Sequence, residues 1–572
     1  MKKEQIKNIL FNASVLLIMF IFMNIFISST LFIFKISINK MNCILALIIT
    51  IVLFIIYSLI KKENLKNNII SILLFLILMT ISLIISNSVY DSSWDGNSYH
   101  KTAIGALKNG WNPNYEQIEE FNESDKNEQK NVLTHKIWNN HYPKAVWIFS
   151  ANIYSITENI ESGKSINFMM LFALLLMTIS YTLKKFNICL SVIVSILVTL
   201  NPVSVSQLFT YYNDGLIYMY IIALITVLLN LLEEDNELIN YTTIVIILAT
   251  LINIKFTGFA YAGITTLFFY IYILLNKKSK KSKIIKLTIA GILSLIIGVG
   301  LIGYSTYIKN FINNGHPFYP LFGEEKIDII TNNQPKEFKD MNRFKKFVLA
   351  NFSESNNITY QVDDDVTLKI PFTIKKNEFS ALSTCDLRIG GFGVLFSGIF
   401  IISVIIILVG MYFMYFSSKK TFFKISIILL LLTSLVIILE EAWWARYLPQ
   451  LYILPFIAIY FLYYFDKKKI SNILIVFLIL LLSTNLSLFF KYNMLYRIRV
   501  SNSIRSEINL LNNENIINVY SKAFDGAIYN LYDKKLKVNI IQDTKEYEND
   551  EYINKLIYCE KLNIYELKEK EK

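Results

Sequence analysis

The chain has 572 residues, of which 54% are hydrophobic and only 17% charged, and its mean hydropathy is positive. Soluble globular proteins carry about 25% charged residues, so this composition excludes an ordinary soluble enzyme, a disordered protein and a nucleic-acid binder. The net charge of +12 lies mostly in short lysine clusters between apolar runs. The four cysteines are far apart and match neither a metal-binding spacing nor a disulfide framework. The sequence therefore predicts an all-α polytopic membrane protein.

Apolar runs long enough to cross a bilayer, about 20 residues each, recur along the chain. They predict about 13 transmembrane helices, at residues 9–34, 42–60, 69–87, 164–183, 188–209, 214–232, 239–254, 256–275, 284–306, 392–416, 421–439, 447–465 and 470–490. In the polar tail after these helices, helical and strand-like patterns alternate, which predicts a small α/β region. Its expected elements are helix 498–511, strand 516–520, helix 524–532 and strand 537–541.

Lysine clusters indicate the orientation of these helices. Positive residues collect on the cytoplasmic side of membrane proteins, and a cytoplasmic amino terminus places every cluster there: 2–7, 61–66, 184–185, 277–283, 419–420 and 467–469. Two long loops, 88–160 and 307–391, then lie outside the cytoplasm. With 13 spans, the carboxyl-terminal tail lies on that same extracytoplasmic side.

The first long loop opens with a dense polar segment, residues 90–100. It carries Asp91 and Asp95, together with Trp94, Tyr99 and His100. A carboxylate at the membrane surface can act as a general base or ligate a divalent cation, although it can equally cap the helix that follows. We expect Asp95 to be the principal catalytic residue and Asp91 a second candidate.

Cationic side chains at the same membrane face are candidates for binding an anionic group. Lys255 lies between two short apolar runs on the outer side, against the positive-inside trend, so it needs a partner, and a phosphate is the simplest one. The guanidinium fork of Arg446 suits phosphate oxygens. Lys144 and His316 rank behind these two, and juxtamembrane lysines such as Lys144 usually extend to the interface.

Aromatic and acidic residues complete the candidate site. Trp443, Trp444 and Tyr447 flank Arg446 and offer flat faces to a sugar ring, although an interfacial aromatic belt has the same composition. Asp214 opens an apolar run, where a carboxylate also suits the helix dipole. Its side of the membrane matches that of Asp95, so we expect it to line the site.

These features together resemble the GT-C superfamily of membrane glycosyltransferases, broadly the bacterial protein O-mannosyltransferase and aminoarabinose-transferase-like group. The resemblance covers roughly residues 69–465 and rests on Trp94-Asp95-Gly96-Asn97-Ser98-Tyr99-His100, His316-Pro317-Phe318-Tyr319-Pro320 and Trp443-Trp444-Ala445-Arg446-Tyr447-Leu448-Pro449-Gln450. The family motif is an Asp-Glu pair, and Gly96 stands here where Glu is usual. The resemblance implies a GT-C-like core at 69–490, additional transmembrane helices at 1–68 and an appendage at 491–572.

The resemblance also implies an activity. We expect a multi-pass protein of the bacterial cell membrane that moves a sugar from a polyprenyl-phosphate donor to an extracytoplasmic glycan, lipid or protein, with inversion and with Asp95 as the base. Arg446, Lys255, His316 and Lys144 would bind the donor phosphate, and a divalent cation, Mg²⁺ or Mn²⁺, is a candidate cofactor without assigned ligands. The alternatives are a flippase or transporter of lipid-linked oligosaccharide and a surface-polysaccharide polymerase or ligase.

Overall fold

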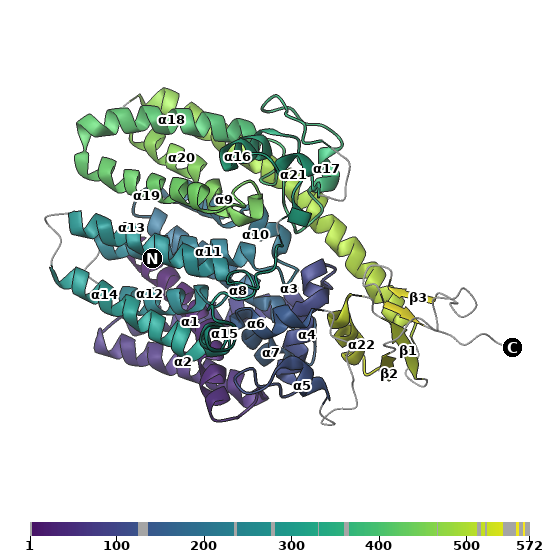
Figure 1. The fold of residues 1–572 in the computed structure, drawn as a ribbon. Coiled ribbons are helices and arrows are strands. Elements are labelled where there is room, and N and C mark those ends of the chain that lie inside the picture. Colours follow the sequence, from purple (N-terminus) through teal and green to yellow (C-terminus); the bar gives the residue numbers. More distant parts are fainter. Residues whose placement is uncertain are drawn as a thin grey trace.

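The computed structural model describes residues 3–123, 135–233, 237–275, 281–329, 331–359, 365–465, 467–511, 516–520, 523–540, 556–559 and 564–566. Helices form a large bundle, and one long helix leads from it to a small β-sheet (Figure 1). The predicted all-α polytopic architecture with a small α/β appendage is therefore confirmed. Lys2 and the lysines at 277, 278 and 280, which belong to the predicted cytoplasmic clusters, lie outside the described residues.

Within the described ranges, ten helical segments are long and apolar enough to cross a membrane. They are α1 (Lys3–Ile33), α2 (Lys40–Ile60), α3 (Leu65–Asn87), the segment Ile160–Thr182 that contains α8 (Ser165–Thr182), α11 (Asp214–Glu233), α13 (Phe256–Leu275), the segment Lys281–Ile302 that contains α14 (Lys281–Leu295), α18 (Phe396–Ser417), α19 (Lys419–Ile438) and α21 (Lys468–Asn509). The other three predicted spans form shorter apolar helices, α9 (Ile188–Thr199), α12 (Glu237–Leu251) and α20 (Leu454–Tyr464). The structure thus supports ten span-length helices where the sequence predicted about 13.

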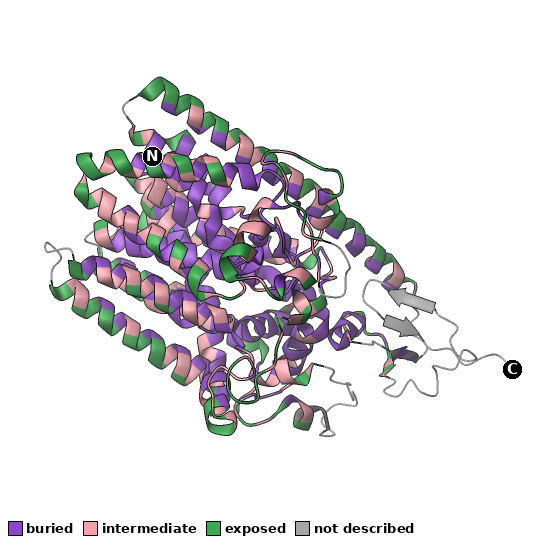
Figure 2. Cartoon of the chain, turned by 45° about the horizontal axis from the view of Figure 1, so that its top comes forward, coloured by how far each residue is buried: buried purple, intermediate pink, exposed green. Residues whose placement is uncertain are grey.

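The burial pattern separates inner helices from outer ones (Figure 2). Helices α1 and α11 are buried along most of their length, and α1 packs on α2, α3 and α8 inside the bundle. Helices α2, α3, α18 and α19 instead present long apolar faces outward, with Leu59, Ile84 and Leu408 among their exposed side chains. Continuous apolar faces of this size mark a surface that does not face water, so these outer helices meet lipid.

Shorter elements extend some of these helices or form the loops between them. The largest is α7 (Ala145–Thr157), an apolar helix of the first loop that hydropathy did not predict and whose side chains are nearly all buried. The remaining short elements are η1 (Gly96–His100), α4 (Lys101–Lys108), α5 (Ile118–Glu123), α6 (Lys136–His141), η2 (Ile160–Lys164), α10 (Pro202–Gln207), η3 (Ile296–Ile302), η4 (Tyr304–Ile308), α15 (Lys309–Asn314), η5 (Thr331–Asn333), η6 (Lys336–Phe338), α16 (Arg343–Phe352), α17 (Glu378–Ala381), η7 (Ala445–Tyr447) and η8 (Pro449–Ile453).

The appendage holds a four-stranded sheet with the order β2-β1-β4-β3. Strands β1 (Ile517–Tyr520) and β2 (Val538–Ile540) are parallel and are connected through η9 (Asp525–Ile528) and α22 (Tyr529–Tyr532). Strand β4 (Ile564–Glu566) runs antiparallel to both β1 and β3 (Leu556–Cys559). The predicted helix–strand–helix–strand order is confirmed, and β3 and β4 are additional strands.

Helix α21 differs from its prediction. The sequence predicted a span that ends at residue 490 and a separate helix from 498, but one continuous helix of 42 residues covers both. Beyond residue 490, Val500, Ile504 and Ile508 form a buried stripe that packs against the β1 side chains Ile517 and Val519. This packing replaces the lipid contacts of the membrane segment, so the helix continues into the appendage.

Candidate functional site

Polar side chains from five separate segments meet around Arg446 at one end of the bundle. Asp95 follows α3, Asp214 is the first residue of α11, and Lys255 lies in the turn between α12 and α13. Asp386 precedes α18, and Arg446 lies in η7 after α19. The structure therefore brings together the predicted residues Asp95, Asp214, Lys255 and Arg446, and it adds Asp386.

The Arg446 guanidinium contacts three carboxylates. Its Nε lies 3.0 Å from Oδ1 of Asp386, and its Nη1 lies 3.5 Å from Oδ2 of Asp214 and 3.9 Å from Oδ2 of Asp95. Aromatic rings form the rest of its surroundings, with the guanidinium carbon 4.5 Å from the Trp444 ring centre and 5.2 Å from that of Tyr447. Planar stacking and several carboxylates together fix the orientation of an arginine, so Arg446 is a rigid cation.

Lys255 and Asp214 form a close ion pair, with 2.7 Å between Nζ and Oδ1. Burial alone would lower the pKa of Lys255, but Asp214 outweighs that effect and the pKa is raised, so the amine stays charged. The ammonium also lies 4.5 Å from the ring centre of Tyr447. The partner expected for Lys255 was a phosphate, and the structure supplies Asp214 in that role.

Asp386 is held by three groups. Arg388 contacts its Oδ2 at 2.7 Å, the Trp444 indole donates to Oδ1 at 2.9 Å, and Arg446 contacts Oδ1 as described. The sequence analysis did not select Asp386 as a site residue. The available signal was the pair Asp386 and Arg388 directly before an apolar run. The partner of Asp386 in the site, Arg446, lies 60 residues later in the chain.

Asp95 is the least constrained of the three carboxylates. Its side chain is 26% exposed, against 3% for Asp214, and Arg446 at 3.9 Å is its nearest cation. Burial is the largest influence on its pKa and raises it; Asp386 raises it further, and Arg446 lowers it in part. A carboxylate with a raised pKa and few fixed partners is free to accept a proton. Asp95 thus has the chemical character of a general base.

Asp91 has a different environment and is fully buried. Its Oδ1 accepts a hydrogen bond from the backbone N–H of Ser93 and its Oδ2 one from that of Tyr211, at 2.8 and 2.9 Å. Both oxygens are therefore used to hold the loop. A Cβ on Gly96 would lie 2.0 Å from the same Oδ2, so Asp91 occupies the space that a side chain at position 96 would need.

A buried charge cluster beneath the loop was missed by sequence reasoning. Glu161 contacts the ammonium groups of Lys101 at 2.7 Å and Lys164 at 2.5 Å, and it accepts a hydrogen bond from Asn530 of the appendage at 2.7 Å. Lys101 also donates to Asn97 and Asn530. Removing one partner of such a buried ion pair leaves an uncompensated buried charge and is strongly destabilising. The cluster joins the appendage to the loop that carries Asp95.

The aromatic residues of the first loop divide by exposure. Trp94 is 54% exposed and meets Phe524 of the appendage at 5.0 Å between ring centres. His100 is buried and accepts a hydrogen bond from the Trp147 indole at 2.6 Å. Its pKa is lowered to about 3, mainly by burial and also by the charge of Lys255. His100 is therefore neutral and packs against Tyr99, which itself has its pKa raised by burial and by Asp95.

Two predicted phosphate ligands are engaged elsewhere. The ammonium group of Lys144 is buried and donates to the backbone carbonyls of Asn140 and Tyr142 at 2.8 and 2.9 Å. His316 accepts a hydrogen bond from the Phe318 N–H and stacks on Phe322 in the loop after α15. Neither residue contacts Arg446 in the described part of the chain. Lys144 and His316 thus shape their own loops.

The predicted aromatic group beside Arg446 is largely buried. Trp443 stacks on Trp444 at 5.2 Å and meets Phe338 edge to face at 5.3 Å between ring centres. The guanidinium carbons of Arg388 and Arg446 lie 4.2 and 4.5 Å from the Trp444 ring centre. The Trp444 ring therefore packs against the guanidinium groups of Arg388 and Arg446, and Trp443 packs against Trp444.

The donor groups do not form a typical metal site. Over the ranges that the structure describes, no three His, Cys, Asp or Glu side chains are grouped as metal ligands. The carboxylates of Asp95, Asp214 and Asp386 instead surround Arg446, so a guanidinium occupies the centre that a divalent cation would need. These residues fit Arg446 better than they fit Mg²⁺ or Mn²⁺.

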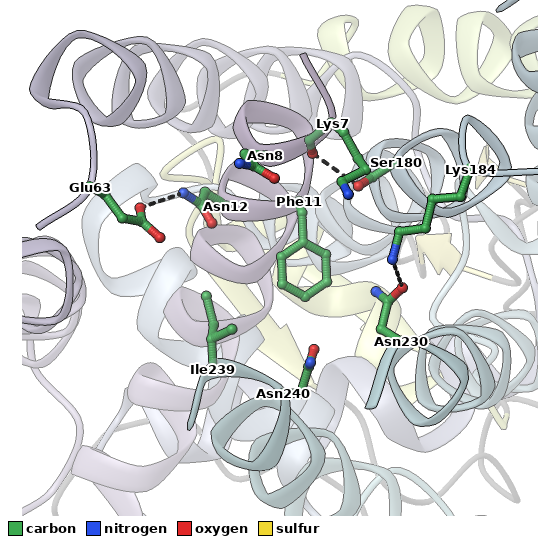
Figure 3. Close-up of a pocket in the computed structure, with 10 residues that line it drawn as sticks. All are labelled: Lys7, Asn8, Phe11, Asn12, Glu63, Ser180, Lys184, Asn230, Ile239 and Asn240. Atoms are coloured by element: carbon green, nitrogen blue, oxygen red, sulfur yellow. Dashed lines mark hydrogen bonds between the residues drawn. The ribbon is translucent and has the colours of Figure 1, made fainter. Parts of the chain in front are cut away.

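A separate polar cavity lies at the opposite end of the bundle. It is lined by residues of α1, α8, α11 and α12 and by Glu63, and within it Asn12 donates to Glu63 at 3.1 Å and Lys184 to Asn230 at 2.8 Å (Figure 3). None of the predicted site residues lines this cavity. It therefore belongs to the end of the bundle that carries the lysine clusters.

No known protein family, curated protein or solved structure matches this chain.

Proposed function

We propose that the protein is a membrane glycosyltransferase that uses a polyprenyl-phosphate sugar and an extracytoplasmic acceptor. One observation carries this proposal: a loosely held carboxylate with a raised pKa, Asp95, lies beside a fixed cation group that contains Arg446 and Lys255. A base next to fixed positive charge is the pairing that displacement of a phosphate leaving group requires. The resemblance to the GT-C superfamily on the same residues supports the proposal.

In the proposed reaction, Asp95 takes the proton of an acceptor hydroxyl or amine as that group attacks the anomeric carbon. The new glycosidic bond forms while the bond between the anomeric carbon and the phosphate oxygen breaks, and the electron pair leaves with the polyprenyl phosphate. Arg446 and Lys255 stabilise the negative charge that develops on this phosphate. Attack opposite the leaving group inverts the anomeric configuration.

A donor panel tests this proposal. The purified protein in nanodiscs is incubated with several polyprenyl-phosphate sugars, and the release of free polyprenyl phosphate is followed. Release that depends on one donor and one acceptor class supports a glycosyltransferase. Absence of release with every donor, together with movement of an intact lipid-linked oligosaccharide across proteoliposomes, would refute it in favour of the flippase alternative.

A further inference from the structure

Arg497 is a buried cation that the proposed chemistry has not used. It lies on α21 beyond the predicted membrane segment, and only 4% of it is exposed. Its Nε is buried and has no hydrogen-bond partner, and its guanidinium forms no ion pair with a residue that the structure describes. A buried N–H group without an acceptor is costly, so the Nε of Arg497 offers an unused hydrogen-bond donor.

The neighbours of Arg497 on α21 place it between the two long loops. One turn earlier, Asn493 donates to the carbonyls of Leu382 and Thr384, both at 2.9 Å. One turn later, Ser501 accepts a hydrogen bond from the Tyr90 N–H at 2.9 Å. Residues four apart lie on one helix face, separated by about 6 Å along the axis. Arg497 therefore faces the junction where the first loop begins and the second ends.

This junction is continuous with the cluster around Arg446. The side-chain amide of Gln207 donates to the Cys385 carbonyl at 3.1 Å and to Asp214 at 3.4 Å. Burial raises the pKa of the Cys385 thiol to about 12, and the groups that act on this pKa electrostatically include Arg497, Asp386 and Asp95. Arg497 and Asp386, which belongs to the Arg446 cluster, are thus both close enough to Cys385 to act on it electrostatically.

The charge balance of the region singles out Arg497. Three cations, Arg446, Lys255 and Arg388, face three carboxylates, Asp95, Asp214 and Asp386, so the cluster is neutral by itself. The neighbouring buried cluster is neutral as well, because its two lysines face Glu161 and Asp91. Arg497 adds one positive charge that no described carboxylate neutralises.

We propose that Arg497 binds the phosphate of a polyprenyl-phosphate lipid at the junction of the two loops, which rests on the function proposed above. A guanidinium recognises a phosphate through paired N–H donors, and a single uncompensated positive charge suits a single phosphate group. Helix α21 connects the membrane segment to this junction, so a lipid whose chain lies in the bilayer reaches Arg497 with its headgroup.

The test is equilibrium binding to the full-length protein in nanodiscs, with geranylgeranyl monophosphate, the matching alcohol geranylgeraniol and inorganic phosphate as probes. The wild type is expected to bind the monophosphate more tightly than the alcohol. Arg497→Gln is expected to weaken monophosphate binding about 10- to 100-fold, the size of a lost charged hydrogen bond, and to leave alcohol binding unchanged. Arg497→Lys should restore part of the loss, and Arg499→Gln, an exposed arginine on the same helix, should have no effect.

Equal binding of the monophosphate by Arg497→Gln and the wild type would overturn the proposal, and so would equal losses for the monophosphate and the alcohol, which would indicate a structural role. Competition by inorganic phosphate at the same concentration would assign the site to a free anion and overturn the lipid assignment. Failure of sugar transfer with intact, Arg497-dependent phosphate binding would refute the proposed function alone.

Discussion

Replacing Arg446 with glutamine removes the nearest cation from Asp95. Two unit charges 3.9 Å apart interact with about 4 kcal/mol at an effective dielectric constant of 20. The Asp95 side chain is 26% exposed, so solvent screening reduces this upper bound. Because Arg446 lowers the pKa of Asp95, its loss is expected to raise that pKa further above the ordinary value.

The consequence is visible in the pH dependence of activity. A general base works only when it is deprotonated, so Arg446→Gln is expected to move the acid limb of kcat/KM to higher pH, and Arg446→Lys, which keeps the charge, to move it less. The assay is the initial rate of polyprenyl phosphate release between pH 4 and 9. Arg343→Gln, which removes an exposed arginine paired with Glu440, is the control. An unmoved acid limb in an active Arg446 variant, or a shift to lower pH, would refute the reasoning.

Further outcomes test the loop, the appendage and the metal requirement. Gly96→Ala is expected to lower the free energy of unfolding by about 1–3 kcal/mol, because its Cβ would lie 2.0 Å from Oδ2 of Asp91. Gly300→Ala is the control, because a Cβ at that position meets nothing within 4 Å. Equal melting temperatures for the two variants would contradict this prediction. The Asp533 carboxylate of the appendage accepts hydrogen bonds from the Tyr154 hydroxyl and the Ile160 N–H. Burial raises its pKa from 3.8 to about 6, so the folded state binds this proton more tightly than the unfolded chain, and docking of the appendage weakens as pH rises from about 4 to 6. The hydrogen-exchange protection of residues 525–532, corrected for the intrinsic pH dependence of exchange, should fall across that range, and Asp533→Asn should abolish the fall. EDTA is expected to leave sugar transfer unchanged, and a loss that Mg²⁺ or Mn²⁺ restores would contradict the assignment of Arg446 to the centre of the carboxylates.

The sequence predicted the membrane helices well because hydropathy is a local property. Ten of the predicted spans have the length and apolar character of membrane helices, and the helix and strand order of the first half of the appendage is confirmed. The continuous course of α21 was not predicted, since hydropathy falls at Lys491 while the helix goes on. Its second half is stabilised by tertiary packing of Val500 and Ile504 on the appendage, which no local pattern reports.

The candidate site divides in the same way. Asp95, Asp214, Lys255 and Arg446 were selected because polar residues at the ends of apolar runs are costly to keep there, and the structure brings all four together. Their pairing was not predictable, because Asp214 and Lys255 are separated by two helices and 41 residues.

Residues whose importance comes only from distant partners escaped the sequence analysis. Glu161 needs Lys101 and Asn530 to reveal its role, and Asp386 needs Arg446. Asp91 shows the opposite case, because its position in a polar motif suggested chemistry while its oxygens hold two backbone amides. These roles are decided by contacts between residues that are far apart in the chain, and a single sequence does not reveal which residues are in contact.

The rate of polyprenyl phosphate release by Asp95→Asn, measured with the donor and acceptor that the wild type turns over, tests the central claim most directly. Asparagine keeps the shape of the side chain and removes the base, so the account predicts a loss of at least about 100-fold with an unchanged melting temperature. Asp340→Asn, which changes an exposed carboxylate of the second loop, should retain full activity. A rate for Asp95→Asn within about twofold of the wild type would contradict a base-catalysed transfer at this site.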